Sequence, residues 1–534
     1  MSQHNQEWGT RVGVILAVAG SAVGLGNFLR FPGQAAANGG GAFMIPYLCA
    51  LLFLGIPIGW AEWTMGRYGG LKGFHSAPGV LGVVGKGRIA RYAGVLGVLI
   101  PLAVSFYYTY IEAWCLGYTW KYLTGGIGVE RGASIQEQTA SAAGFYDAFT
   151  GRLENGVIAG GSIETFVFWV ITFAVNIFLV YRGISKGIEK FVSWAMPAMA
   201  VCALIVLIRV LTLGTPDPAL PDQNVINGLG YMWNPDFAAL GNAQTWLAAA
   251  GQIFFSLSVG FGVIINYASY MKRKNDVVLS GLTASATNEL FEVGFGGMIT
   301  LTASFLFLGL SGTIAAVQGG TFGLGFTTLP VVFAHMPLGN FIGAVWFFML
   351  FLAAITSSIS MYQPSLAFFE ESLGISRRKA TTMMVSICIF GSFLVMYFSK
   401  GSIFWATIDD WVGTFLIFVL AMVQIICFAW VFGIDRGWAE AHAGAQMRMP
   451  KIYKPIMKYV APLYLILVFF AFCYQNLGSW IDAVRQEPLR QGALALIGAT
   501  ILLLVVCTWI GERRWRAAGL DVDGQLPSRG EVKA

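Results

Sequence analysis

The sequence predicts an all-α membrane protein with twelve transmembrane helices, of which the first and the sixth are broken. Three observations support this fold class. Of the 534 residues, 56% are hydrophobic and only 11% are charged, whereas soluble domains carry about 25% charged residues. Apolar stretches of about 20 residues or more, long enough to cross a bilayer, recur along the chain. Two of them are interrupted by glycine and polar residues, which a plain membrane anchor would avoid.

The apolar segments follow one another at regular intervals along the whole chain. They lie at about 11–39, 41–66, 92–124, 165–184, 191–213, 243–270, 280–312, 340–369, 380–398, 402–433, 457–477 and 491–511. We divide the chain into an N-terminal segment (1–10), a first repeat of five spans (11–213), a loop (214–242), a second repeat of five spans (243–433), two further spans (434–511) and a tail (512–534).

The basic residues predict the orientation of the spans. Loops after even-numbered spans are rich in Lys and Arg, for example Lys272, Arg273 and Lys274, whereas the loops near 125–164 and 214–242 are acidic or neutral. Basic residues in short loops mark the cytoplasmic side, so we expect both termini in the cytoplasm and the chain in the cytoplasmic (inner) membrane. The net charge of +6 is not gathered into a domain-sized patch, which argues against nucleic-acid binding.

The first interruption, residues 20–32, reads GSAVGLGNFLRFP and joins three glycines to Asn27 and Arg30. A broken helix leaves backbone amides and carbonyls unpaired, which lipid does not tolerate. We expect these groups to face a small charged ligand and cations, as the broken helices of secondary transporters do. The alternative is a glycine-lined face on which helices pack.

The second interruption lies in the sixth span, where GQIFFSLSVGFG (251–262) places Ser256, Ser258, Gly260 and Gly262 within an apolar run. It comes five spans after the first break and crosses the membrane in the opposite direction. Two inverted five-span repeats would therefore bring both breaks together at mid-membrane. Taken alone, this span would fit an ordinary Ser/Gly packing helix equally well.

No constellation typical of an enzyme is visible. The seven cysteines lie in apolar runs without metal-ligand spacing, and we interpret them as small packing residues. The four histidines, His4, His75, His335 and His442, are far apart at loop edges and are interpreted as surface residues. The N-terminal segment lacks the basic region and short apolar core of a signal peptide.

Several long motifs resemble the neurotransmitter:sodium symporter family, and the bacterial leucine transporter in particular. They are SAVGLGNFLRFP, GGGAFMIPY, EWTMGRYGG, YYTYIEAW, GQIFFSLSVGFG, NYASY, LTASATNE and TSSISMYQP, and the resemblance runs from Trp8 to the last span. It implies the 5+5 inverted-repeat fold of the leucine transporter. It also implies a sodium-coupled symporter that imports amino acids or related amines by alternating access.

The resemblance implies two Na⁺ sites made of oxygen ligands, which this hard cation prefers. For the first site it implies the Ala22 carbonyl, the Asn27 and Asn288 side chains, the carbonyl and hydroxyl of Ser256, and the substrate carboxylate. For the second it implies the carbonyls of Gly20, Val23 and Ala353 and the hydroxyls of Thr356 and Ser357. Taken singly, these side chains would also fit interhelical hydrogen bonds or back-bonding within a helix.

The same resemblance implies where the substrate binds. Its carboxylate would meet the amides of Leu25 and Gly26 and the Tyr108 hydroxyl, and its amino group would meet Ser258 and carbonyls around Ala22, Phe255 and Ser256. Its side chain would face Val104, Phe255, Ser258, Phe261, Ser357 and Met361. Because this pocket is apolar and uncharged, we expect a neutral amino acid with an aliphatic to aromatic side chain.

Four buried or gate charges resemble functional positions of the family. Arg30 and Asp409 resemble the outer gate pair, with Asp410 adjacent to it. Glu292 matches the acidic residue that stands where other members bind chloride, so we expect chloride-independent transport. Glu62 resembles the carboxylate that supports the unwound sixth span. Glu112 remains structural or part of the outer pathway.

The chain departs from the family pattern at three positions. Ser21 stands where the leucine transporter has Asn, next to the substrate site, and Ser256 replaces Thr. At the cytoplasmic gate Trp8 and Tyr270 remain, but Asn5 replaces an Arg, so Glu371 lacks its expected partner unless His4 substitutes. We expect inward opening to be easier as a result.

Two other classes of function remain open at this point. A proton-coupled carrier of amino acids or amines would need a titratable group at the ligand site, and a non-transporting membrane receptor would bind without uptake. The sequence leaves open which amino acid is preferred, whether H⁺ or K⁺ is carried back, and whether the chain forms a homodimer.

Overall fold

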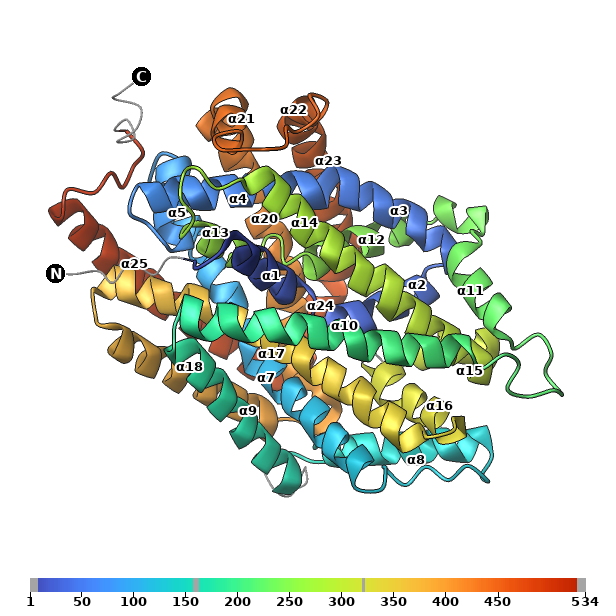
Figure 1. The fold of residues 1–534 in the computed structure, drawn as a ribbon. Helices are drawn as coiled ribbons and strands as arrows, with labels where there is room; N and C mark the ends of the chain where they lie inside the picture. Colours follow the sequence, from blue (N-terminus) through green and yellow to red (C-terminus); the bar gives the residue numbers. More distant parts are fainter. Residues whose placement is uncertain (1–7, 157–162, 319–321, 526–534) are drawn as a thin grey trace.

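The computed structural model describes residues 8–156, 163–318 and 322–525, and in these ranges the chain folds into helices without a strand (Figure 1). The first eleven α-helices are α1 (Arg11–Ala22), α2 (Phe31–Ala37), α3 (Met44–Ala50), α4 (Ile56–Leu71), α5 (Ala77–Val84), α6 (Arg88–Ala93), α7 (Leu96–Leu123), α8 (Ile135–Phe149), α9 (Ile163–Tyr181), α10 (Lys190–Leu211) and α11 (Val225–Trp233). This part contains the first predicted repeat.

The second half continues in the same manner. Its α-helices are α12 (Ala243–Ser256), α13 (Val263–Ala268), α14 (Val277–Glu289), α15 (Met298–Gln318), α16 (Leu329–His335), α17 (Gly339–Leu373), α18 (Arg377–Tyr397), α19 (Ile403–Ile408), α20 (Ile417–Ile426), α21 (Ile434–Ala441), α22 (Tyr453–Pro455), α23 (Ala461–Phe472), α24 (Gly478–Gln486) and α25 (Pro488–Ala517). Short π-helical turns extend several of them, among them η1 (Gly26–Arg30), η4 (Ile184–Glu189), η6 (Leu290–Gly297) and η9 (Asp409–Leu416).

The described residues contain ten helical segments long and apolar enough to span a membrane, and an eleventh if the bent pair Arg11–Ala22 and Gly26–Ala37 counts as one span. The two halves of that pair meet at 45°. The sixth predicted span is divided into α12 and α13, both too short to cross alone. The all-α membrane fold is confirmed, and the count of twelve stays a prediction.

The two breaks have different local causes. After α1 the chain leaves the helix at Val23, which is extended at φ −74° and ψ 94°. Between α12 and α13 three residues adopt left-handed backbone conformations, Ser258 (φ 53°), Gly260 (φ 73°) and Gly262 (φ 84°). Glycine accepts such angles readily, whereas Ser258 is held in one that costs a non-glycine residue on the order of 1 kcal/mol. The sequence itself therefore stops the sixth helix.

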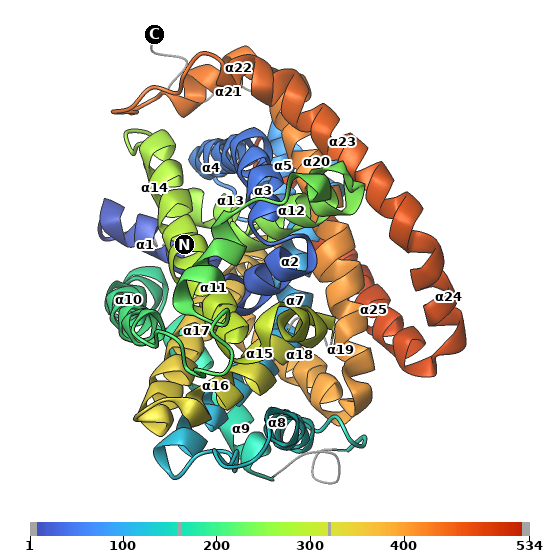
Figure 2. The same ribbon diagram turned by 90° about the vertical axis from the view of Figure 1, so that its right-hand side faces the viewer.

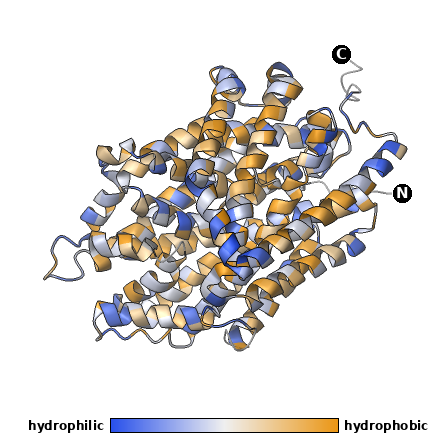
Figure 3. Ribbon diagram, turned by 180° about the vertical axis from the view of Figure 1, so that it is seen from behind, coloured by the Kyte–Doolittle hydropathy of each residue, from blue (hydrophilic) through white to orange (hydrophobic). Residues whose placement is uncertain are grey.

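The long helices α7 and α17 pack along each other through the middle of the bundle, and α1 packs against α10, α14 and α17 (Figure 1). Seen from the side, α23, α24 and α25 lie at one edge (Figure 2). Hydrophobic residues, orange in Figure 3, make up much of the helices. On the outer helices, Leu467, Phe470 and Leu502 are 68%, 66% and 65% exposed. Apolar side chains exposed on the outer helices suit contact with lipid.

Candidate functional site

The two broken helices approach each other closely. A Cβ placed on Gly26 would lie 2.8 Å from the Phe255 ring. Across the same junction the Ser258 hydroxyl donates to the Ser21 carbonyl at 3.3 Å. Glycine at position 26 is needed for this approach. The breaks therefore meet, as the inverted-repeat argument predicted.

The polar side chains predicted for the first ion site come together beside this junction. Asn27 of η1 donates its Nδ2 to Oδ1 of Asn288 at 2.8 Å, and Asn288 donates its Nδ2 to the Ser256 hydroxyl at 2.7 Å. The Asn27 Oδ1 accepts from the Gly24 amide at 2.8 Å. Ala22, at the end of α1, is also buried. Three elements far apart in the sequence thus contribute amide and hydroxyl groups to one buried cluster.

Glu292 belongs to the same cluster. Its carboxylate accepts from Gln252 Nε2 at 2.7 Å, from Asn27 Nδ2 at 3.0 Å and from Asn288 Nδ2 at 3.3 Å. Glu292 is fully buried, and no Lys or Arg of the described chain forms an ion pair with it. Its carboxylate is therefore held by the side-chain amides of Gln252, Asn27 and Asn288 and not by a cation.

Three members of this cluster, Tyr47, Glu289 and Gln252, escaped the sequence analysis. Tyr47 donates its hydroxyl to Glu289 at 2.8 Å, so a second carboxylate lies beside Glu292. Gln252 could have been found, because it precedes Ser256 by one helical turn and shares its face. Tyr47 comes from α3, and no spacing in the sequence points to it.

The residues predicted for the second ion site also converge, where α17 faces the end of α1. The Ser357 hydroxyl donates to the Ser21 carbonyl at 3.1 Å and to the Gly20 carbonyl at 3.5 Å. The Thr356 hydroxyl donates within its own helix, to the carbonyls of Leu352 and Ala353, both at 3.0 Å, which is the back-bonding that was the alternative for this residue. Val23 follows as the last residue before the break. Carbonyl and hydroxyl oxygens in such a group suit a hard monovalent cation.

The residues predicted to hold a carboxylate lie between the two ion clusters. The Leu25 amide donates to the Tyr108 hydroxyl at 3.1 Å. A Cβ on Gly24 would lie 2.7 Å from both the Tyr108 and the Ser357 hydroxyls, so a larger residue would push both hydroxyls aside. Val104, Phe261 and Met361, predicted to surround a substrate side chain, are buried.

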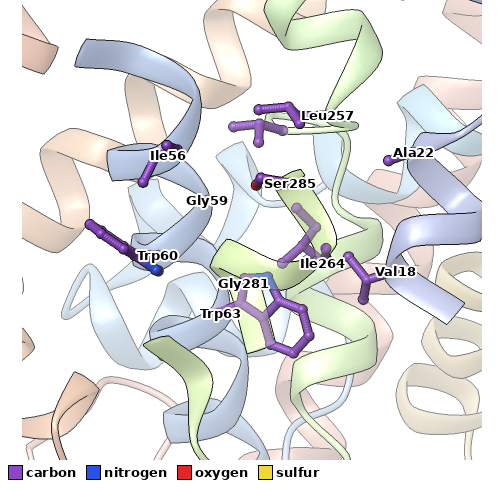
Figure 4. Close-up of a pocket in the computed structure, with 12 residues that line it drawn as sticks. Val18, Ala22, Ile56, Gly59, Trp60, Trp63, Leu257, Ile264, Gly281 and Ser285 are labelled. Carbon is purple, nitrogen blue, oxygen red and sulfur yellow. The ribbon is translucent and has the colours of Figure 1, made fainter. Parts of the chain in front are cut away.

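A small cavity adjoins this junction (Figure 4). Residues of α1, α4, α13, α14 and the α12–α13 connection surround it, namely Val18, Ala22, Ile56, Gly59, Trp60, Trp63, Leu257, Val259, Ile264, Gly281, Ala284 and Ser285. Of the predicted substrate residues only Ala22 lines it. The cavity thus lies behind the broken end of α1 and not among Val104, Phe261 and Met361.

On one side of the site Arg30 covers Phe255, with its guanidinium carbon 4.3 Å from the ring centre. No ion pair joins Arg30 to Asp409, and Arg30 Nη1 has no hydrogen-bond partner among the described residues. Asp409 instead accepts from the Tyr107 hydroxyl at 2.6 Å, and Asp410 pairs with Arg490 at 3.7 Å. The two predicted gate residues therefore lie at the site without a direct contact.

On the opposite side, Glu371 is fully engaged. It accepts from the amides of His75 and Ser76 at 2.6 and 2.9 Å and from the Ser76 hydroxyl at 2.9 Å. Trp8 donates its indole Nε1 to the Tyr267 carbonyl at 3.0 Å. Among the described residues no cation pairs with Glu371, and the chain before α5 holds it through amide and hydroxyl donors instead. His4 and Asn5 lie outside the described residues.

The three histidines that the structure describes, His75, His335 and His442, are partly exposed and each has a specific contact. His75 stacks on Tyr270 with 4.4 Å between ring centres, and burial lowers its pKa to about 4. His335 contacts Gln138 at 2.8 Å, and His442 contacts the Trp438 carbonyl at 2.7 Å. Each one has a packing or hydrogen-bond role that its position at a loop edge did not reveal.

Two further buried carboxylates have specific partners. Glu62 Oε1 accepts from the Gly260 amide at 3.3 Å, within the connection between α12 and α13. Glu112 accepts from Asn176 Nδ2 at 2.9 Å, and Asn176 in turn accepts from the Ser358 hydroxyl at 2.7 Å. Glu62 thus contacts the second break, whereas Glu112 connects α7 to α9 and α17.

A membrane bundle with two broken helices and polar clusters at their junction is the arrangement typical of secondary transporters. The sequence model of the Sodium:neurotransmitter symporter family matches residues 5–514. This chain belongs to that family, whose members are sodium-dependent transporters.

Relatives and a solved structure agree with this membership. An uncharacterized sodium-dependent transporter of Methanocaldococcus jannaschii is 30% identical, covering 94% of this chain and 97% of the relative. The sodium-dependent dopamine transporter of Bos taurus is 26% identical over 88% of this chain and 69% of its own. The crystal structure of MhsT in complex with L-phenylalanine superimposes with a TM-score of 0.73 at 26% identity, covering 87% of this chain and 99% of MhsT.

Proposed function

We propose that this protein imports a neutral amino acid with an aliphatic to aromatic side chain, driven by two Na⁺ ions and without chloride, by alternating access. The observation that carries the proposal is the buried contact of Asn27, Ser256 and Asn288 at the junction of the two broken helices. Amide and hydroxyl oxygens there suit Na⁺, and the junction is built from two helices whose movement would open it.

The second ion and the substrate are inferred from the neighbouring groups. Gly20, Ala353, Thr356 and Ser357 offer carbonyls and hydroxyls on the other side of Gly24. A substrate carboxylate bound between the clusters, at Leu25 and Tyr108, would serve the first Na⁺ as a ligand. Each would then improve the binding of the other by the same factor, which is the coupling that symport requires.

The side-chain preference follows from the surroundings. Val104, Phe255, Phe261 and Met361 are apolar. The charged group beside them is the Arg30 guanidinium over the Phe255 ring, which we assign to the outer gate and not to the substrate side chain. The complex of MhsT with L-phenylalanine supports a ligand of this class. Met361 is flexible and polarizable, so the pocket is expected to accept several sizes.

Chloride independence follows from Glu292. An anion site needs free donors, and the donors here, Gln252, Asn27 and Asn288, already bind the Glu292 carboxylate. A fixed negative charge at that position replaces a mobile one. Transport should therefore proceed equally in chloride and in gluconate.

For the orientation we propose the cytoplasmic membrane with both termini inside, on the distribution of basic loops. Glu371, Trp8 and Tyr270 then lie on the cytoplasmic side, and Arg30 and Asp409 on the outer side.

The test is uptake of a labelled hydrophobic amino acid into proteoliposomes, challenged by each of the other nineteen, with Na⁺ or K⁺ outside and with chloride or gluconate. We expect uptake that needs Na⁺ and is inhibited by neutral apolar amino acids only. Uptake driven by a pH gradient without Na⁺ would indicate a proton-coupled carrier. Binding without accumulation would indicate a receptor.

A further inference from the structure

The start of α1 is held by a buried carboxylate from another part of the chain. Glu189, the last residue of η4, accepts from the Gly9 amide at 2.9 Å, from the Thr10 amide at 3.0 Å and from the Thr10 hydroxyl at 2.8 Å. Thr10 is the N-cap of α1, and its hydroxyl also accepts from the Gly13 amide at 2.9 Å. One carboxylate thus binds the amides before the helix and, through Thr10, the helix itself.

Among the described residues, Glu189 is stabilised by these hydrogen bonds and by no cationic side chain. It is 9% exposed, and no ion pair of the described chain includes it. A buried carboxylate without a cation depends on its hydrogen-bond donors, and here the positive end of the α1 dipole adds to them. If α1 moved away from Glu189, the carboxylate would lose these hydrogen bonds. Water entering from the cytoplasmic side would then have to replace them.

The first turn of α1 is shaped to admit this carboxylate. A Cβ on Gly13 would lie 2.1 Å from Glu189 Oε1, so any larger residue would displace it. Two other contacts hold this end of the chain. Arg11, 28% exposed, pairs at 3.5 Å with Asp276, whose side chain is 1% exposed, and Trp8 donates to the Tyr267 carbonyl at 3.0 Å. Glu189 differs from both because it binds the backbone amides that precede α1 and the Thr10 cap.

We propose that Glu189 is a positioning residue that latches the cytoplasmic half of the first broken helix, and that transport requires this latch to open. The inference rests on alternating access as proposed above. α1 carries Gly20 and Ala22 at its far end, so a movement at Thr10 is transmitted along a rigid helix to both ion clusters.

The experiment measures how fast a cysteine on α1 reacts with N-ethylmaleimide in proteoliposomes. Ala17 is fully buried on α1, so Ala17→Cys, in a chain whose seven native cysteines are replaced, reports separation of the helix from the bundle. The variants are Glu189→Ala, Glu189→Gln and Gly13→Ala. The Gly13→Ala variant keeps Glu189 but displaces its carboxylate. Labelling is measured in K⁺ and in Na⁺.

We expect Glu189→Ala and Gly13→Ala to raise the labelling rate by at least about tenfold in K⁺, the shift that losing a hydrogen bond to a charged group produces. The labelling rate of Glu189→Gln, which keeps one accepting oxygen, should lie between the rates of these two variants and the rate of the parent. The Na⁺ concentration for half-maximal uptake should rise in the same order. A general folding defect would not produce this order among the variants.

Glu137→Gln is the matched control. Glu137 likewise binds a helix start, accepting from the Ser134 amide at 2.9 Å and hydroxyl at 2.8 Å, but it does so on α8. It should leave labelling unchanged. Equal rates in parent, Glu189→Ala and Gly13→Ala in K⁺ would overturn the latch. The effect of Na⁺ on the parent alone tests the proposed coupling separately, because the latch is judged from the ratio of variant to parent.

Discussion

Asn27 and Asn288 are 261 positions apart in the sequence, yet the Nδ2 of the first lies 2.8 Å from the Oδ1 of the second. One belongs to the first broken helix and the other to α14, which packs against α1. The contact places two carboxamides in the same buried volume as Ser256 and Glu292. Most of the proposed chemistry can be tested through this cluster.

Asn288→Ala should weaken Na⁺ binding without preventing folding. It removes a carboxamide oxygen and leaves Asn27 and Ser256 without one partner each, a cost of about 1–3 kcal/mol. We expect the Na⁺ concentration for half-maximal uptake to rise at least about tenfold. Asn476→Ala is the control, because Asn476 donates only to the Phe472 carbonyl of its own helix. Equal Na⁺ dependence in both variants would contradict the first ion site.

Glu292→Ser should make uptake depend on chloride. Without the carboxylate, the donors of Gln252, Asn27 and Asn288 are unpaired and a negative charge is missing, so a small anion can restore both. We expect uptake in gluconate to fall at least about tenfold and to recover in chloride. Glu289→Gln, which leaves Glu292 in place, should not create this dependence. Activity of Glu292→Ser that ignores the anion would refute the assignment.

The spans were well predicted because long apolar runs determine them. The eighth span was expected at 340–369, and α17 covers Gly339–Leu373. The helices within loops were missed, since α11 and α16 are short and lie in stretches read only as connections. For α8 a signal existed, the capping box formed by Ser134 and Glu137. Its neighbouring apolar residues were too few to suggest a span.

The site was predictable where residues lie at the breaks, and less so where distant loops contribute. Asn27 and Ser256 carry their own signal, because polar groups in interrupted spans need a partner. Ser357 lies in the unbroken α17 and was expected from the family resemblance alone. No sequence signal indicated the groups that bind Glu371, because they are the backbone amides of His75 and Ser76. For the same reason the contact between Glu189 and the start of α1 emerges only from the structure.

Tyr108→Phe should impair substrate binding and leave the fold intact. The hydroxyl meets the Leu25 amide at 3.1 Å, where we place the substrate carboxylate, while the ring remains available for packing. Loss of one hydrogen bond to a charged group costs about 1.5–3 kcal/mol, so KM should rise at least about tenfold. Tyr110→Phe, whose hydroxyl donates to the Thr150 carbonyl, is the comparison. A KM that is the same in both would argue against the carboxylate position.

Gly24→Ala should abolish transport while the protein still folds. The added methyl group would lie 2.7 Å from the hydroxyls of both Tyr108 and Ser357, and these side-chain ends can move aside. Moving them removes groups from the proposed carboxylate and second ion positions, so uptake should fall at least about a hundredfold, about 2.7 kcal/mol. Gly498→Ala in α25 has no atom within 4 Å of the new methyl group and should leave uptake unchanged. Yield and thermal stability measured after purification distinguish a damaged site from a misfolded protein. A Gly24→Ala protein that is as stable as the parent but inactive supports the site. A Gly24→Ala protein with parental uptake contradicts it.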